Sequence, residues 1–383
     1  MRRILLLLCC LLPLSILPVW GNEKVTPPTS PTATTPAEAE LGKRTAEQIE
    51  HDCKLVKDDK ALARLNAIVA DIAPMTQRPD VIYTCKILDT PALNAESIPG
   101  GTVYVTKGLL DAVESDDELA GVLAHEIAHN SLRHVKKLME RESKASMMQI
   151  VTLIAAIYAN KGDAVNAGQL LTMSELVKQA LVNGYTTTLE AEADANAVTY
   201  LDKLKKYNPV GLYSVILGFR QIEEHHPTVE LGYLKTHPYS DERRKLLEQK
   251  FKELHIPINL WAVVNFRAKV VPPLKGSADG TVLRLGDVNL FTYTTTATDM
   301  DPTTRAAEAA LAINKRLLKD YIQQYEVDDD IHDGMLYINL RTVPVIALTQ
   351  ADANTRGMTL NALGSLIVQN IKTAIWHEAV KRS

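Results

Sequence analysis

The feature that most constrains the fold of this chain is a short run, His125-Glu126-Ile127-Ala128-His129, inside an apolar helical pattern. Side chains four positions apart project from one face of an α-helix, so both imidazoles can reach one metal ion. Glu126 lies beside them and can deprotonate a water bound to that metal. The alternative is a helix with two incidentally spaced histidines, but buried histidines need partners. The run therefore predicts a helix that carries a metal site.

A third ligand is needed, because a catalytic zinc usually has three protein ligands and one open position. Further along the same helix, a three-histidine pattern would need a glycine and then a histidine, and these positions hold Leu132 and Val135. His134 is one position out of register, so we expect it to be a solvated helix residue.

A later acidic run, Leu189 to Asp194, offers carboxylates instead. Glu190 and Asp194 are one helical turn apart and share a face, whereas Glu192 points elsewhere. We expect Glu190 to bind zinc and Asp194 to accept the far N–H of a ligand histidine, which would fix its tautomer. The alternative is an ordinary acidic helix face.

The N-terminal residues are typical of a secretory signal peptide. A basic pair, Arg2-Arg3, precedes a continuous apolar run, 4–12, and small residues suited to cleavage after Gly21. We expect residues 1–21 to be removed on export to a Gram-negative periplasm. Two prolines and the short apolar core argue against the alternative, an uncleaved anchor helix. Residues 22–36 form a Pro/Thr-rich linker, which we expect to be extended.

Two folded domains are expected, residues 37–256 and 257–383. The first is mainly α with a small β-sheet, and the second is a small α+β domain of β-β-α-β-β-α order. In the first domain, helices are predicted over 37–73, 116–139, 145–159, 164–182, 187–206, 209–224 and 240–254, and strands over 81–88 and 102–106. In the second, strands are predicted over 281–296, 335–340 and 343–349, and helices over 302–325 and 358–379.

Two segments leave alternatives open. The strand Thr102 to Thr106 presents either a free edge, to which an extended peptide could add, or a covered strand. The apolar run Met147 to Tyr158 is too short to span a bilayer. It is either core or a lid that touches a membrane surface. Asp328 to Gly334 looks calcium-binding, but Ile331 occupies a ligand position, so we expect a solvated turn.

Charge and cysteine content exclude some classes of function. The net charge is −4, or −6 without the two arginines of the signal, and no long Lys/Arg block occurs, so we expect no nucleic-acid binding. Cleavage would leave Cys53 and Cys85, which either pair in an oxidising compartment or remain buried thiols. Two cysteines cannot build a cysteine-rich zinc site.

Taken together, these motifs resemble the gluzincin zinc metallopeptidase family of the CAAX prenyl protease, HtpX and the periplasmic BepA. The paired histidines are followed some sixty residues later by Glu190-x-x-x-Asp194. Three further segments agree with the family and keep its order. They are Leu41-Gly42-Lys43, Asn94 to Leu110, and Thr236-His237-Pro238 with Arg243. The resemblance covers about residues 38–255.

The resemblance implies a zincin-type fold, one zinc ion per chain held by His125, His129 and Glu190, and Glu126 as the catalytic base. It also gives His237 a site role, either filling the fourth zinc position in a latent state or donating a hydrogen bond to the oxyanion. Arg243 would support the site or that oxyanion. Membrane members of the family have spanning helices and BepA has helical repeats, neither of which occurs in this chain.

The function implied is endoproteolysis of misfolded or misassembled envelope proteins, with outer-membrane assembly machinery as a further partner. A second hypothesis is a chaperone or assembly factor that grips extended chains through a latent zinc site. A third is a scaffold with a structural zinc, but a structural site needs no base such as Glu126.

Overall fold

The computed structural model describes residues 32–139, 187–225, 237, 239–272, 280–295, 297 and 300–381. The expected signal peptide, residues 22–31 of the linker, the expected helices over 145–159 and 164–182, and the apolar run Met147 to Tyr158 lie outside these residues. Within them, no helix is both long and apolar enough to cross a bilayer.

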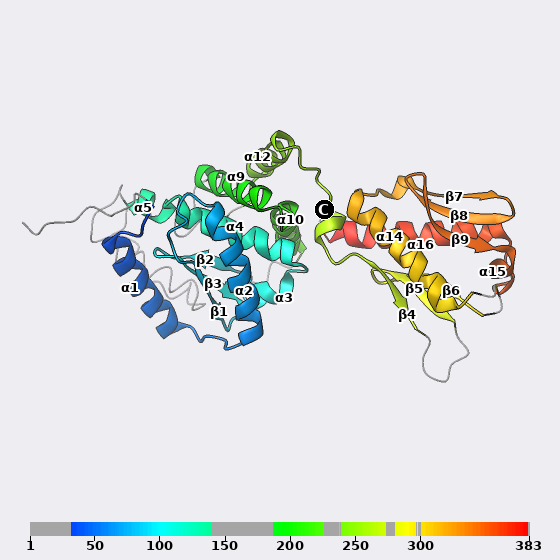
Figure 1. Cartoon of the computed structure of the whole chain (residues 1–383), viewed down its shortest axis with the longest axis horizontal. Helices are drawn as coiled ribbons and strands as arrows, with labels where there is room; N and C mark the ends of the chain where they lie inside the picture. The colour runs from blue at the N-terminus through cyan, green and yellow to red at the C-terminus, as the bar shows by residue number, and fades with distance from the viewer. Residues whose placement is uncertain are drawn as a thin grey trace, which may run out of the picture.

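The described elements form two parts that lie end to end (Figure 1). The first part contains a mixed three-stranded sheet and a set of helices. Its helices are α1 (Pro36–Asp52), α2 (Asp59–Ile72), α3 (Lys107–Ala112), α4 (Asp116–Ser131), α5 (His134–Met139), α9 (Thr187–Leu204), α10 (Val210–His225) and α12 (Asp241–Glu253), with a 3-10 turn at Ala73–Met75. The expectation of a mainly α domain with a small sheet, followed by an α+β region, is confirmed.

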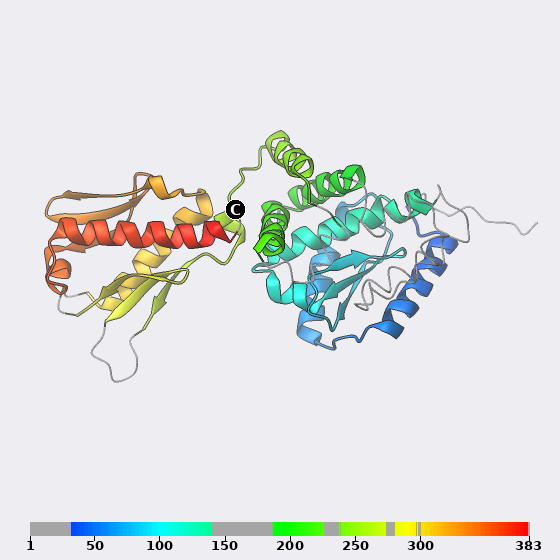
Figure 2. The ribbon, with the colours of Figure 1, turned by 180° about the vertical axis from the view of Figure 1, so that it is seen from behind.

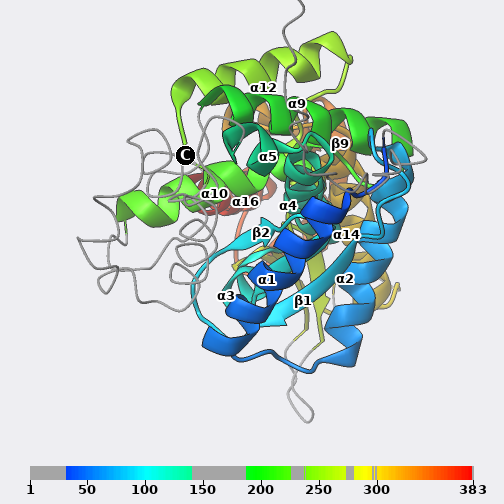
Figure 3. The ribbon, with the colours of Figure 1, turned by 90° about the vertical axis from the view of Figure 1, so that its left-hand side faces the viewer.

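Helix α4 is the centre of the first part. The Ser115 hydroxyl accepts a hydrogen bond from the Glu118 N–H, and three acidic residues in the first turn favour the positive end of the helix. Every residue from Glu118 to Ser131 is buried, because α2, β2, α9 and α10 all contact this helix. In Figure 3, α4 lies between the sheet and α9. Polar side chains on α4 are therefore held in a dry interior.

The sheet has the order β1-β3-β2, with β1 at Thr84–Leu88, β2 at Ala95–Ser97 and β3 at Thr102–Thr106. Strand β3 pairs in parallel with β1 and antiparallel with β2. The expectation that residues 102–106 offer a free edge is therefore wrong, and the covered alternative is right. Residues Val103 to Thr106 are all buried, which fits a central strand with a hydrogen-bonded neighbour on each side.

Two long helices of the sequence prediction are each divided in the structure. Residues 37–73 form α1 and α2, since Asp58 caps a new helix start. Residues 116–139 form α4 and α5, with Arg133 between them at φ +56°, in the left-handed region. Apolar periodicity is similar on both sides of each break, so it does not reveal them.

The second part contains two antiparallel three-stranded sheets. One is β4 (Ala268–Val271), β5 (Thr281–Leu285) and β6 (Val288–Tyr293). The other is β7 (Val327–His332), β8 (Met335–Leu340) and β9 (Val343–Thr349). The expected β-β-α-β-β-α order therefore lacks β4 and β7. The solvated turn expected at Asp328 to Gly334 is instead mostly part of strand β7. An edge strand with four exposed positions carries little apolar signal in the sequence.

Helices α14 (Pro302–Lys319) and α16 (Leu360–Val380) lie between these two sheets (Figure 2). Helix α14 contacts β4, β5 and β9, whereas α16 contacts β6, β7 and β8. Three short helical segments complete this part, namely α13 (Leu260–Val263), a 3-10 turn at Gln324–Glu326 and α15 (Gln350–Asn354). Each sheet therefore buries one face against the helical layer.

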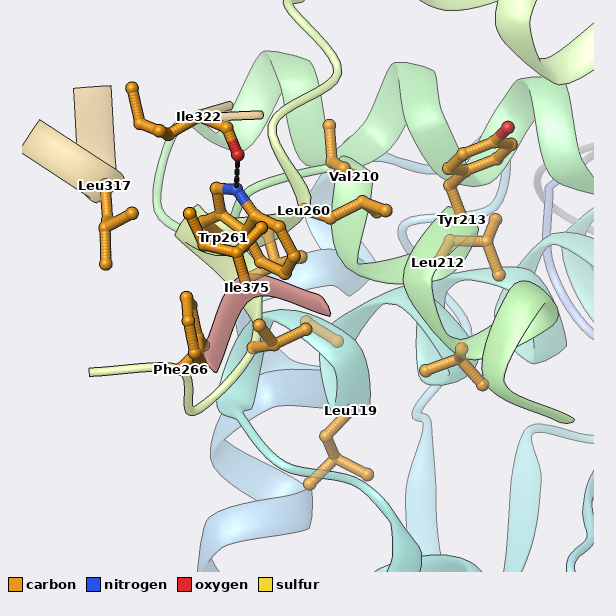
Figure 4. Close-up of a cluster of buried hydrophobic side chains, with 14 of the residues drawn as sticks. Leu119, Val210, Leu212, Tyr213, Leu260, Trp261, Phe266, Leu317, Ile322 and Ile375 are labelled. Atoms are coloured by element: carbon orange, nitrogen blue, oxygen red, sulfur yellow. Dashed lines mark hydrogen bonds between the residues drawn. The ribbon is translucent and has the colours of Figure 1, made fainter. Parts of the chain in front are cut away.

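Trp261 of α13 lies where the two parts meet. Its ring packs on Phe266 and Tyr321, and its indole N–H donates to the Ile322 carbonyl over 2.9 Å (Figure 4). Helix α13 contacts α10 of the first part and α14 of the second. The apolar core is therefore continuous through this junction.

Cys53 and Cys85 are not joined by a disulfide in the structure. Cys53 follows α1 and is half-buried, and Cys85 is buried in β1. Of the two sequence alternatives, the structure has thiols rather than a disulfide. Burial raises the pKa of Cys85 to about 12, so this thiol is a poor nucleophile at neutral pH.

Candidate metal centre

Four side chains from three segments meet in the interior of the first part. His125 and His129 come from α4, Glu190 comes from α9, and His237 comes from the segment between α10 and α12. All four are at most 1% exposed. One ligand atom from each lies within 4.8 Å of the others, so this group could hold a metal ion.

The four candidate ligand atoms are close to one another. His125 Nε2 lies 2.9 Å from His129 Nε2 and 3.2 Å from His237 Nδ1. Glu190 Oε1 lies 3.2 Å from His129 Nε2 and 3.0 Å from His237 Nδ1. Glu190 Oε2 lies 3.4 Å from His125 Nε2.

These residues fit zinc. Imidazole nitrogen and carboxylate oxygen are ligands that zinc prefers, and tetrahedral bonds of about 2.0–2.1 Å separate ligand atoms by about 3.3 Å. His125 Nδ1 lies 2.8 Å from the Asp194 carboxylate, which places its ring hydrogen there. The Nε2 lone pair of a neutral His125 is then directed at the centre. The donor types, their spacing and this tautomer all suit a zinc site.

Arg243 holds the two carboxylates of α9 in place. Its guanidinium contacts Asp194 through Nε at 2.5 Å and Nη2 at 2.9 Å, and Glu190 through Nη1 at 2.8 Å. The same Nη1 donates to the His237 carbonyl over 3.1 Å. Burial raises the pKa of both carboxyls, but the charge of Arg243 together with the neighbouring histidines outweighs it and leaves each pKa below its usual value. Arg243 therefore links both carboxylates of α9 to the backbone of His237.

Glu126 faces the centre from the same helix as the two histidines. One carboxylate oxygen accepts the Ser97 N–H of β2 over 3.0 Å, and the other lies 3.3 Å from His237 Nε2. Ser97 Oγ also donates to the Glu126 carbonyl over 2.6 Å. Burial raises the pKa of Glu126 to about 8. A carboxyl with such a pKa can both accept and return a proton near neutral pH.

His134 departs from the sequence prediction. It is fully buried, with its Nδ1 3.0 Å from His129 Nδ1 and its Nε2 3.3 Å from Glu192 Oε2. On an unbroken helix, His134 would lie about 140° around the axis from His129. The left-handed Arg133 ends α4 and brings His134 back beside His129. The expectation of a solvated residue was therefore wrong.

Sequence reasoning missed two contributions to the centre. Ser97, which contacts Glu126, lies within the family-like segment Asn94 to Leu110, but the sequence assigns it no role. Glu192 does not share a face with Glu190, as the helical spacing predicts, and it contacts His134 instead. The signal that could have found it is the spacing of carboxylates at 190, 192 and 194 read together with His134.

Comparison with known proteins gives two family matches. A model described as Peptidase family M48 matches residues 59–250, which is just over half of the chain and includes the whole metal centre. A model described as Domain of unknown function (DUF8459) matches residues 282–378, within the second part.

Curated relatives of two kinds are similar to this chain. Metalloendopeptidase OMA1, mitochondrial, from Bos taurus is 26% identical over 214 residues, covering 53% of this chain and 39% of the relative. The putative beta-barrel assembly-enhancing protease of Vibrio cholerae is 34% identical over 120 residues, covering 28% and 25%. The beta-barrel assembly-enhancing protease of Yersinia pestis is 25% identical over 159 residues, covering 41% of this chain and 32% of the relative. This chain covers less than half of the length of each of these relatives.

Proposed function

This chain belongs to peptidase family M48, and from that premise we propose that it is a zinc-dependent endopeptidase acting on misfolded or stalled proteins of the cell envelope. The observation that carries the proposal is the buried convergence of His125, His129 and Glu190 with Glu126 beside them. Asp194 and Arg243 support the proposal, because they orient and neutralise the groups that would hold the ion.

The residues of the site suit hydrolysis of a peptide bond. A zinc ion held here supplies Lewis-acid chemistry, which polarises a carbonyl and acidifies water. Glu126 accepts the proton of the attacking water and delivers it to the leaving amine, so the same carboxyl is base and then acid. Its contact with the Ser97 N–H holds it in the orientation that both proton transfers require.

We further propose that His237 keeps the resting site latent. Its Nδ1 lies in the ligand group, and its Nε2 is 3.3 Å from the Glu126 carboxylate that would act on water. A neutral imidazole in the fourth position leaves no room for the attacking water. The other role expected from the sequence, a hydrogen bond to the oxyanion, requires His237 to leave this position first.

This position of His237 also favours a second candidate function. A protein whose site stays closed can bind extended chains without cutting them, which would make it a chaperone or assembly factor. The similarity to beta-barrel assembly-enhancing proteases supports outer-membrane assembly machinery as a partner. The signal-peptide pattern of residues 1–21 supports a periplasmic location, whereas the OMA1 relatives are named as mitochondrial.

One experiment separates these functions. Purified protein is analysed for metal content by mass spectrometry and for digestion of casein as an unfolded substrate. Wild type is compared with Glu126→Gln, His237→Ala and the control His51→Ala, whose histidine is exposed. We expect one zinc per chain, at least about 100-fold slower cleavage in Glu126→Gln, faster cleavage in His237→Ala, and no change in the control.

Each other result has a distinct meaning. Zinc without cleavage in every variant would support the chaperone function and reject the endopeptidase. Equal cleavage by wild type and His237→Ala would reject latency alone. Wild-type protein that takes up no zinc would reject the metal centre itself.

A further inference from the structure

We propose that His134 and Glu192 form a pair that positions His129 as a metal ligand. This inference rests on the proposed zinc site, but it concerns residues outside the ligand group. The pair has two contacts: His134 Nδ1 lies 3.0 Å from His129 Nδ1, and His134 Nε2 lies 3.3 Å from Glu192 Oε2.

The tautomers of the two histidines follow from the direction of the lone pairs. If His129 presents its Nε2 lone pair to the metal, its Nδ1 carries the ring hydrogen. That buried N–H needs an acceptor, and His134 Nδ1 is within hydrogen-bond distance. His134 then carries its own hydrogen on Nε2 and donates it to the Glu192 carboxylate. Donors and acceptors alternate consistently from Glu192 to the metal centre.

His125 has a comparable polar contact at its own outer ring nitrogen. His125 Nδ1 meets a carboxylate of α9 directly, at 2.8 Å from Asp194. His129 lies one turn further along α4, and His134 bridges from it to Glu192 on the same helix α9. Helix α9 therefore supplies one carboxylate to the ligand group and one to the outer nitrogen of each of the two α4 histidines, directly for His125 and through His134 for His129.

The local backbone supports this role for His134. The turn at Arg133 places His134 beside His129, and the His134 side chain is fully buried. Glu192 is held from outside by Lys137, whose ammonium lies 3.1 Å and 3.3 Å from its two oxygens. An imidazole at this depth with a polar contact at each nitrogen has a fixed ring orientation, which it can impose on His129.

The test measures Zn²⁺ affinity of the full chain by competition with a chelating dye at constant pH. The variants are His134→Leu, His134→Asn, Glu192→Ala and the control His51→Leu, which makes the same change at an exposed histidine. The midpoint of thermal unfolding of each metal-free protein is recorded alongside. This readout separates a loss of packing from a loss of metal binding.

We expect His134→Leu to weaken Zn²⁺ affinity by about 10–100-fold. His134→Asn should restore most of it, because the asparagine oxygen can accept the His129 N–H close to the position of the lost nitrogen. Glu192→Ala should weaken affinity less, and the control should match wild type. A purely structural role would instead lower the unfolding midpoint of metal-free His134→Leu without changing Zn²⁺ affinity.

Wild-type Zn²⁺ affinity in His134→Leu would overturn the proposal while leaving the zinc site intact. If His134→Leu does not fold, the other two variants decide. Wild-type affinity in Glu192→Ala, together with no detectable Zn²⁺ binding by His134→Asn, would also overturn the proposal. Wild-type protein that binds no Zn²⁺ would instead reject the proposed function on which the inference rests.

Discussion

At the scale of single residues, Arg243 supplies a positive charge beside the two buried carboxylates of the metal centre. Two carboxylates, Glu190 and Asp194, are buried within reach of one guanidinium. Burying two carboxylates without a cation would cost several kcal/mol for each ion. Arg243 contacts both, and together with the neighbouring histidines it keeps the carboxylates ionised and available to His125 and to a metal.

His125 makes zinc binding depend on pH. Burial by itself lowers the pKa of His125, but Glu190 and Asp194 outweigh it and raise the pKa to about 9 in the metal-free protein. Below that pH the ring is protonated, and zinc must displace one proton to bind. We expect Zn²⁺ affinity to rise about tenfold per pH unit between pH 6 and 8 and to level off above about pH 9. Titration calorimetry in buffers of different ionisation enthalpy measures the proton release.

The control for this prediction is Asp194→Asn, in which the raised pKa of His125 loses one of its causes. Its affinity should depend less steeply on pH near the upper end of the range. A wild-type affinity that is constant from pH 6 to 8 would contradict the assignment of a protonated His125.

At the scale of elements, α4 and α10 approach so closely that glycine is needed at the contact. A Cβ on Gly121 would lie 2.4 Å from the Leu212 backbone nitrogen, and a Cβ on Gly211 would lie 2.1 Å from the Asp117 carbonyl oxygen. Both distances are shorter than any real contact, so the helices would have to separate. This contact holds α4, and with it the metal ligands, against the α10 side of the domain.

Gly121→Ala should therefore destabilise the protein, although alanine favours helices more than glycine does. We expect a loss of about 1–3 kcal/mol in the free energy of unfolding, from overpacking against the backbone of α10. Urea unfolding followed by circular dichroism measures it. A gain in stability, as helix propensity alone would give, would show that the two helices are not in contact here.

At the scale of the whole molecule, Trp261 joins the two parts. Its side chain is 1% exposed, and its helix α13 contacts α10 of the first part and α14 of the second. Trp261→Ala should cost about 3–5 kcal/mol, whereas Trp376→Ala, at a tryptophan that is 55% exposed on α16, should change stability by no more than about 0.5 kcal/mol. Circular dichroism during urea unfolding measures both. Equal effects of the two substitutions would contradict a packed junction.

The sequence by itself determined the mainly α first part, the α+β second part and which histidines and carboxylate are candidates to hold a metal ion. Each depends on local spacing: histidines four apart on one helix, carboxylates four apart on another, and capping residues at helix starts. Such patterns can be recognised in sequence because the period of a helix fixes which side chains share a face. The assignment of catalytic roles to those residues stays a prediction.

Only the tertiary structure decided the position of His134, the central place of β3 and the third strand of each later sheet. The physical reason is common to all three. A single residue in the left-handed conformation, the choice of strand neighbours and the pairing of a polar edge strand depend on contacts between distant segments. Local sequence periodicity does not encode those contacts, so only the folded structure reveals them.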